Sequence, residues 1–448
     1  MFKKILVANR GEIACRVLQS AQRLGVATVA VYSEADAKAR HVRMADEAFC
    51  IGAAPVSESY LQIERVLDVM RKTGAEAVHP GYGLLSENAA FARAIESLGR
   101  VFIGPEASCI EAMGSKTRAR AAAESAGVPV LPGSPLLSAD DDEIEAWGQR
   151  IGFPLLIKAT AGGGGIGMKK VKKPEKLLRA AHQVQDQAER FFGDRGLFLE
   201  RLVEEPHHCE VQILGDGLGN AIHLWDRECS VQRRHQKVLE EAPGPFLDET
   251  QREALCQAAC ALAASVSYRG AGTVEFLADA SGAFYFLEMN TRLQVEHPVT
   301  EAITGMDLVE QQFRIALGEG LPCTQAEVTR HGHAIEFRIC AEDPARRFAP
   351  CPGTIDSWDF PEGEGIRLDT GVEVGTEVTP FYDSLLAKLI VYGTDRNEAI
   401  RRAADALARC RVEGIQTNLE LHRQLLENER IQSGNYDTGI LLDMGYKG

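Results

Sequence analysis

Short apolar runs alternate with amphipathic segments over the first 103 residues. Four runs have the length of buried strands: 5–8, 28–32, 77–79 and 101–103. Between them, residues 13–24 and 91–98 repeat apolar positions at helical spacing. Strands that alternate with helices predict a doubly wound, parallel sheet. Because no G-x-G-x-x-G follows the first strand, the sequence does not predict a dinucleotide site there.

The same periodicity predicts further elements along the chain. Residues 110–126 have a helical pattern, with Lys116 near the helix start, and 128–133 is a breaker-rich linker into a small subdomain. The C-terminal part mixes predicted strands with a helix: 335–340, 388–392 and 398–408. Alternation along the first of these strands places Arg338 on its polar face.

A glycine-rich loop joins two predicted strands in the small subdomain. The first strand, 153–159, carries Lys158, the loop covers 162–167, and the second strand covers 168–171. Rossmann and Walker loops enter a helix instead, and no G-K-[ST] follows here. A strand–loop–strand flap is typical of a lid whose backbone N–H groups close over phosphates, with the lysine as a point charge. The alternative is a flexible linker, which needs no flanking strands.

Polar side chains are concentrated in two more stretches and one loop. Alternation over 208–214 places His208 and Glu210 on one face, together with Gln212 if the strand is regular. Arg227 and residues 232–237 form the densest basic cluster, which indicates an anion site or a solvated charge run. The loop 79–83 follows a strand, where α/β sheets place ligand-contacting loops, although it can equally be a tight turn.

A hairpin with acidic side chains is predicted over 272–287. Its strands, 272–278 and 284–287, are joined by a short turn, so Glu275 can face Glu288. Alternation puts Glu288 and Asn290 on one face, with Arg292 if the extended chain continues. Two carboxylates and an amide oxygen are ligands that suit Mg²⁺. The alternative, a solvated strand face, is weakened by how closely these polar groups follow one another beside apolar strands.

Composition narrows the class of protein. The 448 residues suggest about three domains, and 45% apolar with 25% charged residues are ordinary globular values. A net charge of −15 argues against general nucleic-acid binding. No apolar run is long enough to span a membrane, and the start of the chain is not signal-like. Eleven scattered cysteines without a C-x-x-C predict reduced thiols in a cytoplasmic protein and make a zinc site improbable.

Four motifs in this order resemble those of biotin carboxylase, a member of the ATP-grasp superfamily. They are the loop 79–83, the flap 162–167, the basic run 233–237 and the block 288–298. The resemblance covers essentially the whole chain. It implies an α/β fold with an N-terminal doubly wound, parallel-sheet domain over 1–113, an ATP-grasp domain over 114–330 with its flap at about 132–203, and a C-terminal mixed α/β domain over 331–448.

The resemblance also assigns roles to individual residues. Those implied to contact ATP are Lys116, Lys158, Gly164, Gly165, Glu200, Arg201, Leu202, Val203, His208, Gln232, His235, Glu275 and Glu288. Those implied to hold Mg²⁺ or Mn²⁺ are Glu275, Glu288 and Asn290. Those implied to bind bicarbonate are Lys237, Arg292, Gln294 and the Val295 backbone. Biotin would contact Tyr82 and Arg338. The implied catalytic residues are Arg292, Glu296, Lys237 and Arg338, with Glu296 as the base and Arg338 stabilising the biotin enolate.

Three departures from the family pattern concern the flap, the dimer and the carrier. Ile166 stands between the last two flap glycines, where relatives commonly have a basic residue. Gln19 and Arg23 stand where bacterial relatives carry an Arg and an acid at a dimer interface, and we still expect a homodimer. No Ala-Met-Lys-Met-type attachment site occurs before the end at Gly448, so we expect the biotin carrier protein and the carboxyltransferase to be separate chains.

The implied reaction is ATP-dependent carboxylation of carrier-bound biotin, with bicarbonate and a carboxyphosphate intermediate. We expect the chain to be the biotin carboxylase subunit of an acyl-CoA carboxylase, first of all acetyl-CoA carboxylase in fatty acid synthesis. Two alternatives remain: an ATP-grasp ligase for another carboxylate, and an ATP-binding regulatory protein without turnover. Retention of Lys237, Glu275, Glu288, Arg292 and Glu296 argues against the regulatory protein.

Overall fold

The N-terminal unit of the computed structural model is a five-stranded parallel sheet, as the alternating pattern predicted. The structure describes residues 1–138, 140–159, 167–192 and 195–446. The strand order is β3-β2-β1-β4-β5, and the strands are β1 (Lys4–Val7), β2 (Ala27–Tyr32), β3 (Glu47–Cys50), β4 (Ala77–His79) and β5 (Val101–Phe102). The helices of this unit are α1 (Gly11–Arg23), α2 (Arg40–Met44), α3 (Ile63–Thr73) and α4 (Ala89–Ser97). Three of these elements, β3, α2 and α3, were not predicted.

The prediction of a single helix over 110–126 is wrong in one respect, because this segment forms two helices with a break between them. They are α5 (Ala107–Gly114) and α6 (Lys116–Ser125), and Ser115 between them has an extended backbone with φ −92° and ψ 111°. Serine is a poor residue inside a helix and a preferred residue at a helix start, which apolar periodicity does not register. The break makes Lys116 the first residue of α6.

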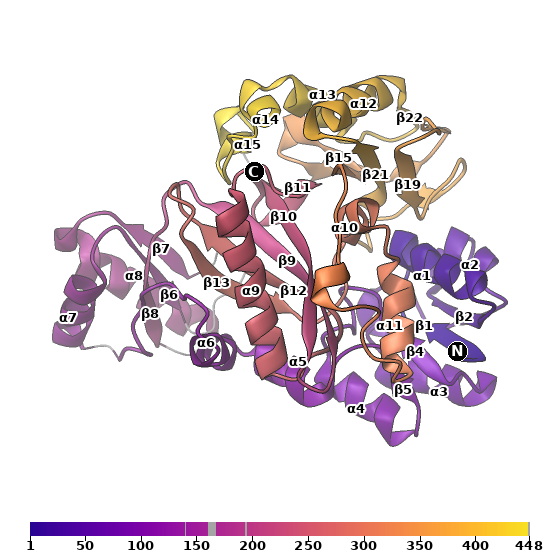
Figure 1. Cartoon of the computed structure of the whole chain (residues 1–448), viewed down its shortest axis with the longest axis horizontal. Helices are drawn as coiled ribbons and strands as arrows, with labels where there is room; N and C mark the ends of the chain where they lie inside the picture. The colour runs from indigo at the N-terminus through magenta and orange to yellow at the C-terminus, as the bar shows by residue number, and fades with distance from the viewer. Residues whose placement is uncertain (139, 160–166, 193–194, 447–448) are drawn as a thin grey trace.

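The flap subdomain is a separate three-stranded sheet that projects to the left in Figure 1. Its order is β7-β6-β8, with strands β6 (Leu155–Ala159), β7 (Met168–Val171) and β8 (Leu197–Arg201). Helices α7 (Asp141–Ile151) and α8 (Leu177–Phe192) pack against this sheet, and buried Ile144 and Val184 contribute to their shared core. The predicted loop residues Gly164 and Gly165, and also Ile166, lie outside the described residues.

The largest sheet joins the middle of the chain to its C-terminal part. Its order is β13-β12-β9-β10-β11-β14-β21-β19, and its neighbouring strands are antiparallel. The strands are β9 (His207–Asp216), β10 (Ala221–Arg233), β11 (Gln236–Ala242), β12 (Arg269–Ala278), β13 (Phe284–Asn290), β14 (His333–Cys340), β19 (Ile366–Thr370) and β21 (Leu385–Gly393). The sheet therefore continues across residue 330, where a domain boundary was expected.

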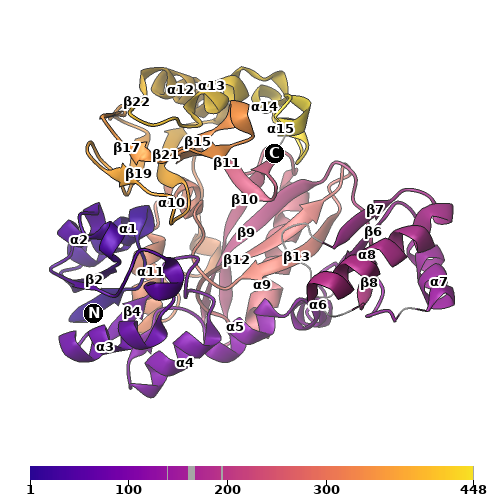
Figure 2. The same ribbon diagram turned by 180° about the vertical axis from the view of Figure 1, so that it is seen from behind.

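Helices cover this sheet, and short strands complete the C-terminal part (Figure 2). The helices are α9 (Glu249–Ser265), α10 (His297–Thr304), α11 (Leu308–Ala316), α12 (Arg396–Arg409), α13 (Leu419–Glu427), α14 (Glu429–Ser433) and α15 (Ile440–Asp443). The short strands are β15 (Glu342–Asp343), β16 (Ala349–Pro350), β17 (Gly353–Thr354), β18 (Ser357–Asp359), β20 (Glu377–Val378) and β22 (Arg411–Glu413). None of the described helices is long and apolar enough to cross a membrane.

Candidate active site

The predicted hairpin is confirmed, and its register sets the position of the acidic side chains. β12 and β13 pair antiparallel, with Glu275 directly opposite Glu288. β9 pairs with the other edge of β12 and places Glu210 opposite Glu275. Three carboxylates on neighbouring strands are thereby brought to one level of the sheet, and charges that lie so close need cations between them.

The Lys237 side chain supplies a cation among the buried carboxylates. From β11, its Nζ donates to Glu210 at 2.5 Å, to Glu275 at 3.0 Å and to Glu296 at 2.5 Å. All three acceptors are buried. Burial opposes protonation of Lys237, but the three carboxylates outweigh it and raise the Lys237 pKa well above its usual value. The ammonium therefore stays charged and connects the sheet to the loop after β13.

Glu296 has cationic partners on both carboxylate oxygens. Lys237 contacts Oε1, and the Nη2 of Arg338 donates to Oε2 at 2.9 Å. Glu296 also occupies the N-cap position of α10, where the helix dipole favours a negative charge. Burial opposes ionisation, but Lys237, Arg338 and Arg227 outweigh it, so the pKa of Glu296 lies well below its ordinary value. The structure thus holds an ionised carboxylate in a buried position between two cations.

Two carboxylates hold the predicted biotin-contacting side chains. Arg338 donates through Nε to Glu240 at 2.6 Å. The Tyr82 hydroxyl donates to Glu12, whose other oxygen lies 3.1 Å from the fully buried Nζ of Lys388. Burial and Glu12 raise the pKa of the Tyr82 hydroxyl well above its usual value, and Arg338 opposes this rise. Sequence patterns identified neither Glu12 nor Lys388 as part of this group.

The loop that carries Tyr82 is fixed by Asn9 at the end of β1. Its Nδ2 donates to the carbonyl oxygens of Pro80 at 2.7 Å and Tyr82 at 2.8 Å. Gly81 has φ +65°, and a Cβ atom there would lie 2.7 Å from Asn9 Nδ2. Only glycine fits this turn without strain or clash. The loop is thus both a tight turn and a support for Tyr82, so the two interpretations of 79–83 are compatible.

Arg292 lies beyond the end of β13 and does not continue the strand, although its side chain contacts Asn290, the last residue of that strand. Its Nη2 donates to the Asn290 side-chain oxygen at 2.9 Å, and its Nε donates to Glu87 at 2.9 Å. Glu87 also accepts from the Thr291 backbone N–H at 3.1 Å. Glu87 therefore anchors the turn after the hairpin to the N-terminal unit. No sequence pattern distinguishes it, since it is one of 64 acidic residues and lies in a loop.

Glu275 joins the predicted nucleotide and metal residues. His208 Nε2 lies 2.9 Å from Oε2, and Oε1 accepts from Asn290 at 2.8 Å and from Gln294 at 2.6 Å. Burial opposes ionisation of Glu275, yet Lys237 and His208 lower its pKa. An ionised carboxylate opposite exposed Glu288, with the Asn290 amide beside it, is a donor set that fits a hard divalent cation.

A second set of ligand atoms fits a cation less well. His208, Glu210 and Glu275 bring one potential ligand atom each within 4.8 Å of one another. Glu275 belongs to both sets, but both oxygens of Glu210 already accept from cations, Oε1 from Arg227 at 2.5 Å and Oε2 from Lys237 at 2.5 Å, whereas Glu288 is exposed. The hairpin residues are therefore the better candidate metal site.

Arg227 is part of the structural framework rather than of an anion site. It is fully buried and donates five hydrogen bonds at 2.5–3.0 Å, to Glu210, Gln212, Thr273, Gln294 and Thr300. A guanidinium has five N–H donors, so none remains for a substrate. Arg227 is therefore removed from the anion site that the sequence predicted, and Lys237 is the member of the basic cluster that contacts all three of Glu210, Glu275 and Glu296.

The predicted nucleotide-binding residues come from several separate elements. Lys158 on β6 forms an ion pair with Glu200 on β8, and β8 ends at Arg201, just before Leu202 and Val203. Gln232 on β10 lies 3.3 Å from His208 Nδ1 through its amide nitrogen. His235 is exposed in the turn between β10 and β11, and Lys116 is the first residue of α6. The structure thus brings Gln232 to His208 and Lys158 to Glu200, while the ATP roles of these residues stay predictions.

Three family models match consecutive parts of the chain. The model described as biotin carboxylase, N-terminal domain, matches residues 1–110. The model described as carbamoyl-phosphate synthase L chain, ATP binding domain, matches 115–324. The model described as biotin carboxylase C-terminal domain matches 336–443.

Individual relatives match over nearly the full chain. A biotin carboxylase of Halalkalibacterium halodurans is 53% identical and matches over 98% of this chain and 97% of its own length. A pyruvate carboxylase component of Methanothermobacter thermautotrophicus is 50% identical over 98% of this chain and 89% of its own length. A solved structure that matches is the biotin carboxylase domain dimer of Hydrogenobacter thermophilus 2-oxoglutarate carboxylase, in complex with MgADP, ADP and bicarbonate. It is 46% identical, has a TM-score of 0.92, and the match covers 99% of this chain and 98% of that chain.

Proposed function

The chain belongs to the biotin carboxylase family, whose reaction is the ATP-dependent carboxylation of biotin, and we propose that the residues around Lys237 and Glu296 perform it. This assignment rests on one observation: Glu296 is held ionised between Lys237 and Arg338. A buried base with a cation on each side is suited to a reaction that starts from one anion and produces another.

In the proposed first step, bicarbonate binds to Lys237, Arg292, Gln294 and the Val295 backbone, and Glu296 accepts its proton. Bicarbonate draws Lys237 partly away from the Glu296 carboxylate, which raises the proton affinity of that carboxylate at the moment when a base is needed. The deprotonated oxygen attacks the γ-phosphoryl group of ATP, so that a carboxyphosphate and ADP form. Lys116, Lys158 and His208 neutralise charge on the phosphates.

Glu275, Glu288 and Asn290 would hold a divalent cation, which would neutralise charge on the ATP phosphates. The relative from Hydrogenobacter thermophilus was solved with MgADP and bicarbonate, which supports these ligands for this chain. The adenine would lie along Glu200, Arg201, Leu202 and Val203, beside Gln232 and His235.

In the proposed second step, carboxyphosphate releases CO₂ and phosphate, and the phosphate takes the N1′ proton of biotin. The enolate that remains is held by Arg338, with Tyr82 against the biotin, and its nitrogen attacks CO₂. Glu240 keeps Arg338 oriented for this charge. The flap residues, including Gly164 and Gly165, would exclude water, which otherwise hydrolyses carboxyphosphate.

The test is ADP release with ATP, Mg²⁺ and bicarbonate, with and without free biotin. We expect turnover that depends on bicarbonate and increases with biotin, and a fall of about 10²–10⁴-fold in Glu296→Gln. The matched control is Glu377→Gln, which removes an exposed carboxylate of the C-terminal part. ATP binding without bicarbonate-dependent turnover would instead support a regulatory protein, and turnover with another carboxylate would support a different ATP-grasp ligase.

We propose further that biotin is presented by a separate carrier protein and that a carboxyltransferase passes the carboxyl group to an acyl-CoA, first of all acetyl-CoA in fatty acid synthesis. The relative named simply biotin carboxylase supports a component of this kind, whereas other relatives belong to pyruvate and 2-oxoglutarate carboxylases. The test is transfer of labelled bicarbonate in the reconstituted complex. A product from pyruvate or 2-oxoglutarate, and none from acyl-CoA, would overturn this proposal.

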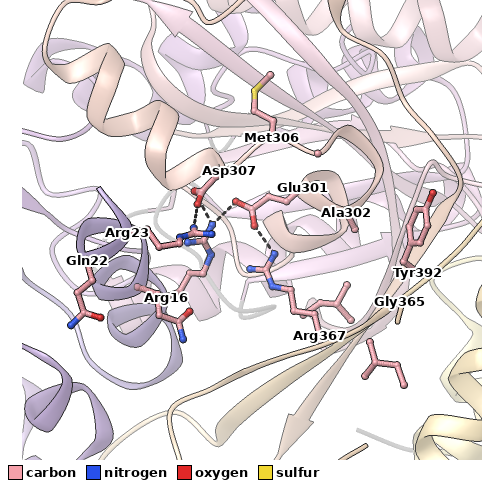
Figure 3. Close-up of a pocket in the computed structure, with 14 residues that line it drawn as sticks. Arg16, Gln22, Arg23, Glu301, Ala302, Met306, Asp307, Gly365, Arg367 and Tyr392 are labelled. Carbon is pink, nitrogen blue, oxygen red and sulfur yellow. Dashed lines mark hydrogen bonds and ion pairs between the residues drawn. The ribbon is translucent and has the colours of Figure 1, made fainter. Parts of the chain in front are cut away.

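We also propose a homodimer whose contact surface includes the pocket of about 740 Å³ shown in Figure 3. Gln19 and Arg23 line this pocket, and the relative from Hydrogenobacter thermophilus was solved as a dimer. Inside it, Glu301 accepts from Arg16 at 2.6 Å and from Arg367 at 2.7 Å, so a second copy can cover the surface without leaving these charges unpaired. Sedimentation should show a dimer for the wild type and a shift to monomer for Arg23→Glu.

A further inference from the structure

Two carboxyl groups that contact no substrate in the proposed mechanism lie behind Arg338. Glu240 on β11 and Glu336 on β14 are directly opposite each other in the antiparallel pair, and both are 0% exposed. Residues in this relation have Cβ atoms about 4.5–5.5 Å apart. Glu336 and Arg338 are two residues apart on one strand, so their side chains leave the same face. Glu240 reaches that face too, because it accepts a hydrogen bond from Arg338.

Hydrogen bonding differs between the two carboxyls. Glu240 uses Oε1 to accept from Arg338, whereas its Oε2 has no hydrogen-bond partner among the described residues. Both oxygens of Glu336 also lack a partner within the described part of the chain. Buried polar atoms without partners are rare and costly, and an unpaired buried carboxylate is the costliest case. Three such atoms on facing carboxyls therefore need a physical explanation.

The surroundings favour the neutral form of Glu336. One side of the pair borders a small apolar cluster of Ala242, Val299, Ile303, Ala334 and Ile390. Charged and titratable groups face the pair from every element packed against it: Lys237 on β11, Cys229 on β10, Arg338 on β14, Lys388 on β21, Glu296 at the start of α10 and His297 within it. Burial raises the pKa of Glu336 well above its ordinary value, Lys388 opposes this, and Glu240 adds to it.

We propose that Glu336 is a positioning residue that holds a proton and donates it in a hydrogen bond to Glu240 Oε2. One proton shared in this way satisfies the free Glu240 oxygen and leaves the pair with a single negative charge on the carboxyl that Arg338 contacts. Glu240 is then fixed from behind, and it orients the guanidinium that faces Glu296. If both carboxyls were ionised, their repulsion would displace Glu240 and with it Arg338.

The inference rests on the proposed role of Arg338, and its first test does not need that role. Infrared difference spectra between wild type and Glu336→Gln at neutral pH should show the carbonyl band of a protonated carboxylic acid in the wild type alone. The control Glu377→Gln should keep the band. Absence of a band that depends on residue 336 would overturn the proposal, whatever the activity of the protein.

The second test separates positioning from a purely structural role. Glu336→Gln keeps an N–H donor towards Glu240 and should retain more than about a third of the wild-type kcat, whereas Glu336→Leu has similar bulk without a donor and should lose about tenfold or more. As pH rises through the Glu336 pKa, the wild type should lose activity along an alkaline limb that Glu336→Gln lacks. Equal kcat values for the two variants, or an unchanged limb in Glu336→Gln, would overturn the proposal. Thermal unfolding of both variants checks that they are folded.

Discussion

The change from Arg227 to Lys keeps a buried positive charge while removing part of its hydrogen bonding. Arg227 donates to five buried acceptors: Glu210, Gln212, Thr273, Gln294 and Thr300. A lysine ammonium has three donors on one nitrogen, so at least two acceptors lose their partner. Each unpaired buried acceptor costs about 1–3 kcal/mol, which gives a destabilisation of roughly 2–6 kcal/mol.

This loss is a large share of the total stability of about 5–15 kcal/mol that is usual for a folded protein. At about 1 °C per kcal/mol for a chain of 448 residues, the unfolding temperature should fall by about 2–6 °C in scanning calorimetry. Because Gln294 is one of the acceptors that depend on Arg227, the KM for bicarbonate should rise more than the KM for ATP. The matched control is Arg401→Lys, on a residue whose side chain is 66% exposed. An unfolding temperature within about 1 °C of the wild type, which is less than the smallest expected fall of about 2 °C, with both KM values unchanged, would refute this reasoning.

Three more changes probe other contacts. Burial opposes ionisation of Glu241, but hydrogen bonds from His333 and Arg396 lower its pKa to about 2. The stability that the fold gains from the ionised Glu241 is therefore complete above the ordinary pKa of 4.5 and is lost as pH falls towards 2. Arg396→Met should therefore lower the unfolding temperature at pH 7, and the difference from the wild type should become smaller at acid pH. An equal difference in unfolding temperature at neutral and acid pH would contradict this. Glu288→Gln should raise the Mg²⁺ concentration for half-maximal ADP release about tenfold or more, and an unchanged midpoint would remove Glu288 from the metal site. Tyr82→Phe should raise the KM for biotin about 2–10-fold while the KM for ATP changes less, and equal changes would argue against a biotin contact.

The hairpin shows what local patterns can predict. Alternation and turn residues predicted both strands and the opposition of Glu275 and Glu288, because these contacts lie close together in the sequence. Arg292 was expected to extend the strand face and instead reaches Asn290 from a turn. The flap strands on either side of the glycine loop were predicted for the same local reason, while the break at Ser115 was hidden by apolar periodicity that continues through it.

The supporting residues show what local patterns cannot predict. Lys388 and Glu12 come from opposite ends of the chain and meet only because β21 and α1 pack in three dimensions. Glu87 reaches Arg292 across 205 positions. Glu336 resembles an ordinary polar position of a strand, and only the completed sheet shows that it is enclosed. Charged residues whose partners are distant in sequence carry no periodic signal, so their roles follow from tertiary structure alone.

The sheet that continues from β11 to β14 limits how the chain can be divided or recombined. A fragment that stopped before β14 would leave β11 as an edge strand, with a row of unpaired backbone N–H and C=O groups open to other molecules. Such an edge promotes aggregation, and it would also expose the carboxyls of Glu240 and Glu241, which would lose their cationic partners on the C-terminal side. A chimera that exchanges C-terminal parts between relatives must therefore match the side chains on both faces of the sheet where β11 pairs with β14. Whether such a chimera folds depends on this strand pair more than on the connecting loop.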